Sequence, residues 1–304
     1  MPVTRTATAN ADLGSSIGDL RSIRPRAACA TIARMTTSFT TPVPHRTLAH
    51  RLTVFAYGVV AYAVGVAALL ALIVTMLGLV HFTGGTLGQL DIGRALALDA
   101  LLLVAFAVQH SLMARPAFKA WWTRIIPAAC ERSTYVLATG LVLLPMLALW
   151  QPMPEVVWSV QAPNARWLLL AVGVMGWAYL FAASFAINHF ELFGLQQVYH
   201  ALRGRPMTTA PFQERWMYRF DRHPIMTGLL VGLWATPTMA LDHLLFAAGT
   251  TVYVCIGVHF EERALRRAFG VQYDGYRGRV WSIVPTFTGR RSRPMSMGAE
   301  HLER

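Results

Sequence analysis

The sequence has few charged residues and few cysteines for its length. Only 14% of its 304 residues are Asp, Glu, Lys or Arg, and its three cysteines, Cys29, Cys130 and Cys255, form no Cys-x-x-Cys pair. The cysteines therefore predict neither a disulfide framework nor a metal site. No phosphate-binding loop is present and no Gly-x-Gly-x-x-Gly motif follows a strand, which argues against cofactor binding of the soluble Rossmann type.

Acidic residues are scarcer than basic ones. The chain has 15 Asp and Glu against 27 Lys and Arg, a net charge of +12. Such an excess can indicate a nucleic-acid partner, but nearly all the arginines lie in short segments beside apolar blocks. Basic residues in that position set the orientation of membrane helices. We therefore expect no binding of nucleic acid.

Apolar residues make up 55% of the chain and occur in long blocks. This pattern predicts an all-α, polytopic membrane helix bundle, with the lipid bilayer as a partner. The first four blocks are long enough to span a bilayer, whereas the last two are short and predict a C-terminal helical hairpin. The six blocks cover residues 54–80, 95–113, 133–150, 167–187, 225–240 and 243–258.

The basic residues divide the connecting segments into two classes. All but Arg94 and Arg166 lie at or before residue 51, within 115–132, within 203–222, or from residue 263 onward. The positive-inside rule then predicts that both termini and the loops at 114–132 and 188–223 face the cytoplasm. Both ends of the predicted hairpin are on that side, where soluble cofactors are found.

The composition predicts four regions. Residues 1–50 are rich in Thr, Ala, Ser and Arg, and we interpret them as a disordered basic tail, as a transit peptide, or as a segment before a translation start at Met35. Residues 51–187 hold the N-terminal transmembrane helices, residues 188–285 form a cytoplasm-facing core with the hairpin, and residues 286–304 form a second disordered tail.

The hairpin carries titratable residues at both of its ends. Arg222, His223 and Pro224 precede it, and Glu261 and Glu262 follow it. Pro224 favours a helix start and places His223 at the cap, beside free backbone N–H groups that attract anions. Adjacent glutamates point about 100° apart on a helix, so one of them can face inward. We predict that the two ends meet in a pocket; the alternatives are an ordinary helix start and an interfacial salt-bridge cluster.

A second polar cluster follows the fourth block. Asn188, His189, Glu191 and Gln196 lie among aromatic residues at the predicted cytoplasmic edge. His189 and Glu191 have the spacing of an acid/base pair, but two ligands do not make a metal site, so no metal is expected. His110, at the end of the second block, either lines the same cavity or makes an interhelical hydrogen bond.

Three stretches resemble a known family. NHFELFGLQQVY at 188–199, RHPIMTGLLVGLWATPTM at 222–239 and EERALRRAFGVQYDGYRGRV at 261–280 are similar to the bacterial methanethiol S-methyltransferases. These enzymes belong to the isoprenylcysteine carboxyl methyltransferase-like superfamily of integral membrane methyltransferases. The resemblance covers roughly residues 50–285. One departure is Met226, where the wider superfamily usually has a tyrosine.

The resemblance implies methyl transfer from S-adenosyl-L-methionine to methanethiol, a small volatile thiol, giving dimethyl sulfide at a bacterial inner membrane with the site facing the cytoplasm. His189 and Glu191 are the candidates to deprotonate the thiol, with His223 as an alternative. Asn188, Gln196 and His110 would line the substrate site. The implied cofactor residues are Arg222, His223, Pro224, Gly228, Glu261, Glu262, Tyr273 and Tyr276.

Two alternatives stay open at this stage. One is a membrane methyltransferase that acts on a prenylcysteine carboxylate or a lipid. The other is a non-enzymatic membrane protein of the group associated with nitric oxide reduction, in which Glu261 and Glu262 would form only structural salt bridges.

Overall fold

The computed structural model of the chain describes residues 47–80, 88, 90–206 and 214–283. All of them belong to one structural unit, His45–Arg304. The two tails predicted at 1–50 and 286–304 lie outside the described residues, except that the first described helix already begins at Leu48.

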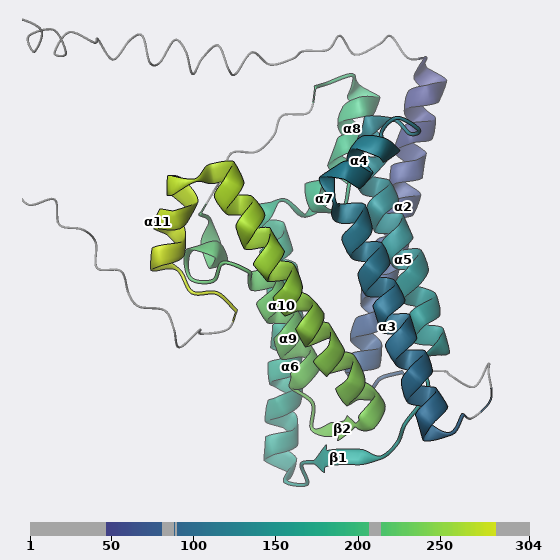
Figure 1. Cartoon of the computed structure of the whole chain (residues 1–304), viewed down its shortest axis with the longest axis vertical. Helices are drawn as coiled ribbons and strands as arrows, with labels where there is room; N and C mark the ends of the chain where they lie inside the picture. Colours follow the sequence, from purple (N-terminus) through teal and green to yellow (C-terminus); the bar gives the residue numbers. More distant parts are fainter. Residues whose placement is uncertain (1–46, 81–87, 89, 207–213, 284–304) are drawn as a thin grey trace, which may run out of the picture. The chain divides into compact units, whose positions relative to one another are not determined.

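Five of the described helices are long and apolar enough to cross a membrane (Figure 1). The chain is therefore a multi-pass membrane protein built as a helical bundle, as the sequence predicts. The five helices are α2 (Leu48–Met76), α3 (Ile92–Ala114), α5 (Glu131–Leu149), α6 (Pro163–Ile187) and α10 (Leu241–Phe269), with the short 3-10 helix η2 (Ala128–Cys130) directly preceding α5.

The C-terminal hairpin differs from its prediction in one respect. Its first helix, α9 (Pro224–Trp234), is short, with 11 residues, but α10 has 29 residues and does not end near residue 258. Glu261, Glu262 and Arg263 favour helix by intrinsic propensity, so nothing stops the helix where the apolar stretch stops. The glutamates therefore lie on α10 itself.

The remaining elements are short. Strands β1 (Val156–Ser159) and β2 (Thr238–Ala240) pair antiparallel, with Val156 opposite Ala240 and an irregularity before Trp158. Because β1 follows α5 and β2 precedes α10, this pairing brings the segment after α5 beside the segment before α10. The short helices are α4 (Pro116–Trp122), α7 (His189–Leu192), α8 (Leu195–Arg203), η3 (Trp216–Arg219) and α11 (Val271–Arg279).

Local sequence signals explain where several helices begin. The hydroxyl of Thr47 accepts a hydrogen bond from the backbone N–H of His50 at 3.4 Å, and the carboxylate of Asp91 accepts one from Arg94 at 3.1 Å. Proline occupies the first turn of α4, α6 and α9, where its missing N–H leaves no helical bond unmade. Pro224 thus starts α9 with His223 at the cap, as predicted.

Glycines allow two pairs of helices to pack closely. In the α6–α9 pair, a Cβ at Gly228 would lie 2.6 Å from the backbone oxygen of Gly176, and a Cβ at Gly173 would lie 2.8 Å from that of Ala235. In the α2–α5 pair, a Cβ at Gly140 would lie 3.1 Å from the backbone oxygen of Val64. Small residues at such contacts are the usual means of helix association in membranes, where apolar burial supplies little driving force.

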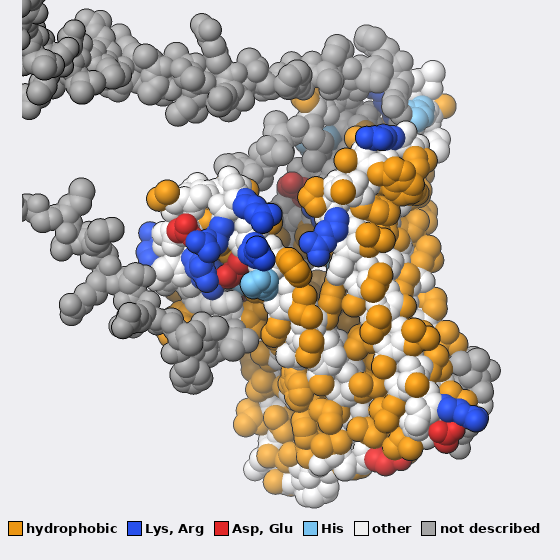
Figure 2. Space-filling model, in the orientation of Figure 1, with side chains coloured by type: hydrophobic (Ala, Val, Ile, Leu, Met, Phe, Trp, Pro, Cys, Tyr) orange, Lys and Arg blue, Asp and Glu red, His pale blue; other side chains and the backbone are white. Residues whose placement is uncertain are grey.

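The two ends of the bundle differ in charge. The end with β1 and β2 lies opposite the end that carries α4, α7, α8 and α11 (Figure 1). Hydrophobic side chains cover the long helices between them, and Lys and Arg gather mainly at the end with α4 and α11 (Figure 2). This distribution is that of a membrane protein with one strongly basic face.

The position of Gly228 yields a test of the packing. Gly228→Ala should lower the stability of the folded protein by about 1–3 kcal/mol, because the added methyl group meets backbone atoms of α6 that cannot move aside. The measurement is thermal unfolding of the purified protein in detergent, without cofactor.

Gly275→Ala is the matched control. A Cβ at Gly275 would meet nothing within 4 Å, and alanine favours helix over glycine, so this variant should be at least as stable as the parent chain. Equal stability of the two variants would contradict the close α6–α9 contact.

Candidate active site

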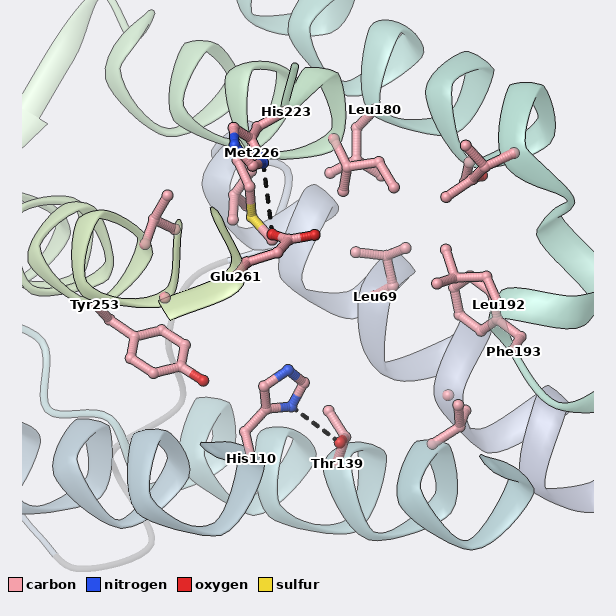
Figure 3. Close-up of a pocket in the computed structure, with 18 of the residues that line it drawn as sticks. Leu69, His110, Thr139, Leu180, Leu192, Phe193, His223, Met226, Tyr253 and Glu261 are labelled. Atoms are coloured by element: carbon pink, nitrogen blue, oxygen red, sulfur yellow. Dashed lines mark hydrogen bonds and ion pairs between the residues drawn. The ribbon is translucent and has the colours of Figure 1, made fainter. Parts of the chain in front are cut away.

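A cavity of about 740 Å³ lies inside the bundle, between the inner faces of α2, α3 and α5 and those of α6, α9 and α10 (Figure 3). Its volume falls within the range of about 300–1,000 Å³ that is usual for small-molecule sites. Most of its wall is apolar. The hydrophobic side chains that form it include Leu69, Leu72, Leu103, Phe106, Leu143, Met146, Leu180, Phe181, Ile225, Met226, Leu229, Phe246 and Val254.

One end of the cavity is charged and lies where α9 begins and α10 ends. Arg222 and His223 line this end just before α9, and Glu261 lines it from α10. Tyr273 and Tyr276 close it from α11. The two ends of the predicted hairpin therefore meet, as the sequence predicts. The segment before α9 is fixed by backbone contacts, since the N–H of Arg222 donates to the carbonyl of Trp281 at 2.9 Å.

Glu262 is the centre of the charged cluster. One of its carboxylate oxygens lies 2.8 Å from Arg222 and 3.3 Å from Nε2 of His223, and the other lies 3.3 Å from Arg277 on α11. Its side chain is only 14% exposed and does not line the cavity. Glu262 thus ties α9, α10 and α11 together.

Glu261 points in another direction. Its side chain is 52% exposed, lines the cavity and lies 3.5 Å from Nδ1 of His223 (Figure 3). Because it is adjacent to Glu262 on α10, the two side chains diverge as the sequence predicts. Of the two glutamates, only Glu261 lines the cavity and can contact a molecule inside it.

His223 lies between the two glutamates and is 5% exposed. Burial lowers the pKa of His223, but the hydrogen bonds that its ring donates to both carboxylates, together with their negative charges, outweigh burial and raise the pKa to about 9. His223 is therefore an imidazolium at neutral pH and has no free lone pair. A base role for His223, one of the sequence hypotheses, does not fit this protonation state.

Tyr273 and Tyr276 are almost fully buried on α11, and both line the cavity. The hydroxyl of Tyr276 donates to the backbone carbonyl of Tyr218 at 2.6 Å. Burial and the nearby charge of Glu262 raise the pKa of Tyr273 to about 12. Both residues therefore present neutral hydroxyls and apolar rings to the site.

Pro224 and Gly228 do not line the cavity. Pro224 is buried at the first turn of α9, and Gly228 faces the backbone of α6. Both residues can therefore affect the cavity only through the position of α9.

The second predicted cluster lies beside the cavity, outside its lining. His189 is 3% exposed, and its ring stacks on Phe185 with the ring centroids 4.3 Å apart. Its Nδ1 lies 2.8 Å from the hydroxyl of Ser184, and its Nε2 lies 3.0 Å from the hydroxyl of Tyr62. Ser184 does line the cavity, so His189 is separated from it by one side chain.

The contacts of Ser184 assign the tautomer of His189. The hydroxyl of Ser184 donates to the carbonyl of Phe181 at 2.7 Å, so its oxygen is left to accept from Nδ1–H of His189. Nε2 then accepts from Tyr62. Burial lowers the pKa of His189, which keeps this neutral form at neutral pH.

Glu191, Asn188 and Gln196 form a local network. Asn188 adopts a positive φ of 105° between α6 and α7, and its side-chain amide donates to Glu191 at 3.1 Å and to Gln196. None of the three lines the cavity. Deprotonation of a thiol by His189 and Glu191 stays a prediction, while their observed contacts shape the connection from α6 to α8.

His110 does line the cavity, as the first of its two sequence interpretations predicts, and it also makes interhelical hydrogen bonds to Tyr135 and Thr139 on α5. Sequence reasoning missed eight further polar residues of the wall. Arginines at membrane edges are read first as topology signals, whereas a hydroxyl inside an apolar span is a signal for a polar cavity. The eight are Arg132, Tyr135, Thr139, Ser184, Arg215, Tyr218, Thr250 and Tyr253.

No group of three or more His, Cys, Asp or Glu residues that could hold a metal ion occurs within the described part of the chain. The chemistry available at the site is therefore that of one carboxylate, several cations, neutral hydroxyls and a large apolar wall.

Comparison with known proteins identifies the family. A methanethiol S-methyltransferase of Mycobacterium tuberculosis is 50% identical over 194 residues, which cover 64% of this chain and 80% of that protein. Methanethiol S-methyltransferase 2 of Bradyrhizobium diazoefficiens is 41% identical over 249 residues, covering 79% and 93%. Nurim of Rattus norvegicus is 35% identical over 180 residues, covering 57% and 68%.

No family model matches the chain, and no solved structure matches it. The two bacterial relatives cover 64% and 79% of this chain, at identities well above those at which only the fold is shared. The chain belongs to the methanethiol S-methyltransferase family.

Proposed function

We propose that this chain methylates the sulfur of methanethiol to give dimethyl sulfide, as a thiol S-methyltransferase of the membrane. The observation that supports it, beyond family membership, is one cavity that joins a charged end to an apolar interior. A small thiol partitions into apolar surroundings, whereas a methyl donor of the cell is polar. A single cavity with both kinds of wall suits the two reactants together.

We propose S-adenosyl-L-methionine as the methyl donor, and the residues of the charged end fit it. Nε of Arg222 is buried and has no hydrogen-bond partner among the described residues, so a donor group remains for an anionic ligand. Arg132 and Arg215 line the same cavity, and guanidinium groups suit the carboxylate of the cofactor. When bound, the cofactor supplies an activated methyl group on a positively charged sulfur.

Glu261 is the residue proposed to face the cationic groups of the cofactor. Its carboxylate is the only acidic side chain among the described residues that line the cavity. His223 holds it in place at 3.5 Å and is itself held by Glu262. Glu262 therefore acts on the site through His223 and Arg222, by positioning them.

The apolar wall is proposed to hold the thiol and to exclude water. A sulfur atom kept close to the methyl group and in line with the bond that breaks needs no further loss of translational freedom to react. Exclusion of water also prevents the activated methyl group from meeting a competing nucleophile.

We place the charged end in the cytoplasm. Among the described residues, Lys and Arg gather there, at the ends of α4, α10 and α11, whereas Arg94 and Arg166 lie in the first turns of α3 and α6 at the opposite end (Figure 2). The bacterial origin of the relatives supports an inner membrane. The cofactor then enters from the cytosol, while the thiol enters through lipid.

The proposal predicts that cells expressing the chain and supplied with methanethiol release dimethyl sulfide, measured in the headspace.

Glu261→Gln should weaken binding of S-adenosyl-L-methionine by roughly 10- to 100-fold, because a hydrogen bond to a charged group contributes about 1.5–3 kcal/mol. Binding of labelled cofactor to the purified protein measures this loss.

Glu155→Gln is the control, because Glu155 is exposed beside β1 at the opposite end of the bundle and should leave both measurements unchanged. Absence of dimethyl sulfide from membrane-inserted protein would contradict the thiol reaction. Binding of the cofactor without dimethyl sulfide would indicate another acceptor, such as a prenylcysteine carboxylate or a lipid.

The protonation of His223 predicts a dependence of stability on pH. The pKa of His223 is raised from 6.5 to about 9 in the folded state, so the folded protein binds this proton more tightly than the unfolded chain. The stabilisation is fully present below pH 6.5 and is lost as the pH rises through about 9. The unfolding temperature should therefore fall over this window.

His223→Gln should be less stable at pH 6.5 and should lose most of this slope between pH 6.5 and 9. His200→Gln, at the end of α8 and far along the chain from the cluster, should keep the slope of the parent. An unchanged slope in His223→Gln would show that another group causes it.

A further inference from the structure

The apolar part of the cavity contains one polar cluster that the binding of the cofactor does not use. His110 on α3 and Thr139 on α5 lie on the cavity wall across from Glu261 (Figure 3), and Tyr135 on α5 and Tyr253 on α10 line the same cavity. The hydroxyl of Tyr135 lies 2.6 Å from Nε2 of His110, and that of Thr139 lies 3.1 Å from Nδ1. The ring of His110 stacks on Phe106, with the centroids 5.4 Å apart.

The hydrogen bonds fix the direction in which this cluster can move a proton. The hydroxyl of Thr139 donates to the backbone carbonyl of Tyr135 at 2.8 Å, so its oxygen accepts from Nδ1–H of His110. Nε2 then carries the lone pair and accepts the O–H of Tyr135. The oxygen of Tyr135 keeps a lone pair of its own, and Tyr135 lines the cavity.

A thiol in this cavity needs such an acceptor. The thiolate is the reactive nucleophile, but a free alkyl thiol is mostly protonated near neutral pH, and an apolar wall disfavours the anion further. Transfer of the thiol proton during methyl transfer removes the need to form a free thiolate. The acceptor must lie on the apolar side of the cavity, where the thiol is held.

We propose that Tyr135 and His110 form the proton acceptor for the thiol. The inference rests on the proposed function and adds the residues that accept the proton. The S–H of methanethiol donates to the oxygen of Tyr135, while the O–H of Tyr135 passes its proton to Nε2 of His110. Tyr135 contacts the substrate, and His110 acts through it.

The step balances in atoms and charge. The electron pair of the S–H bond stays on sulfur, which forms the new bond to the methyl carbon. The pair of the broken C–S bond returns to the sulfur of the sulfonium donor. Tyr135 ends neutral and His110 becomes an imidazolium, so the positive charge of the donor is transferred to His110.

The charges around this cluster are compatible with the step. The ring centroids of Tyr135 and Tyr253 lie 4.8 Å and 6.3 Å from that of His110, and Ser111 lies 3.2 Å from the hydroxyl of Tyr253. The charges of Arg132 and Glu131 at the start of α5 interact electrostatically with Tyr135, and the charge of Arg115 at the end of α3 does so with Tyr253. Among the described residues no carboxylate hydrogen-bonds to His110, so no adjacent negative charge favours its protonated form. The imidazole is therefore neutral and able to accept a proton when the thiol binds.

The test uses the full chain, purified in detergent, with the variants Tyr135→Phe and His110→Gln. Each removes one member of the relay and keeps the size of the side chain close to the original. Tyr57→Phe is the matched control. The hydroxyl of Tyr57, like that of Tyr135, makes a hydrogen bond between helices, in its case with Thr134 of α5 at 2.8 Å, but Tyr57 does not line the cavity.

Two thiols separate the proton acceptor from a structural role. Methanethiol depends on a base, whereas trifluoroethanethiol is more acidic, so a far larger share of it is thiolate without one and its reaction depends less on a base. The ratio of kcat for the two thiols, measured on the same sample, does not depend on how much of the variant is folded. Binding of labelled S-adenosyl-L-methionine is measured in parallel.

We expect Tyr135→Phe and His110→Gln to lower kcat for methanethiol by roughly 10²-fold at neutral pH, the usual contribution of general base catalysis. The loss should be much smaller for trifluoroethanethiol, and it should diminish as the pH is raised. Cofactor binding and the Tyr57→Phe variant should be unaffected.

An equal loss for both thiols, or none for either, would overturn the proposal while the methyltransferase function stands. A parent chain that binds the cofactor but methylates neither thiol would overturn the proposed function, and the acceptor role with it. A loss of cofactor binding in Tyr135→Phe would assign that residue to the donor site instead.

Discussion

The charged end of the cavity depends on one carboxylate, that of Glu262. It is nearly buried and contacts three cations from two other segments: Arg222 and His223 before α9, and Arg277 on α11. Breaking a buried pair of this kind costs about 3–5 kcal/mol, because a charge is left without a partner. Glu262 therefore holds the start of α9 and α11 against α10. Through these contacts it positions the polar groups that line this end of the cavity.

The two adjacent glutamates divide the work between structure and chemistry. Glu262 is fully engaged with cations, which allows Glu261, one residue earlier, to remain half exposed at the cavity wall. His223 links them, and its proton is stabilised by both. The same cavity then changes character along its length, from charges and neutral hydroxyls at one end to a largely apolar wall with the His110 and Tyr135 cluster on it.

Local sequence signals predicted much of this arrangement. Pro224 marks a helix start, His223 occupies its cap, and the two ends of the hairpin meet because both lie at the same end of the bundle. The sequence could not say which glutamate faces inward, since that depends on the rotation of α10, which is set by packing against α3 and α9. For the same reason His189, at the predicted rim, is found behind Ser184, while Tyr135 and Tyr253 reach the cavity from spans that look uniformly apolar.

The close glycine contacts have a mechanical consequence. Gly228 and Gly173 bring α6 and α9 to backbone contact, and Gly140 does the same for α2 and α5, so little free space is left within either pair. The cavity lies between the two pairs. A widening that admits a thiol from the lipid would therefore cost least between the pairs, where α10 meets α3. The thiol would then enter from the side of the bundle, away from the contacts that hold the charged end together.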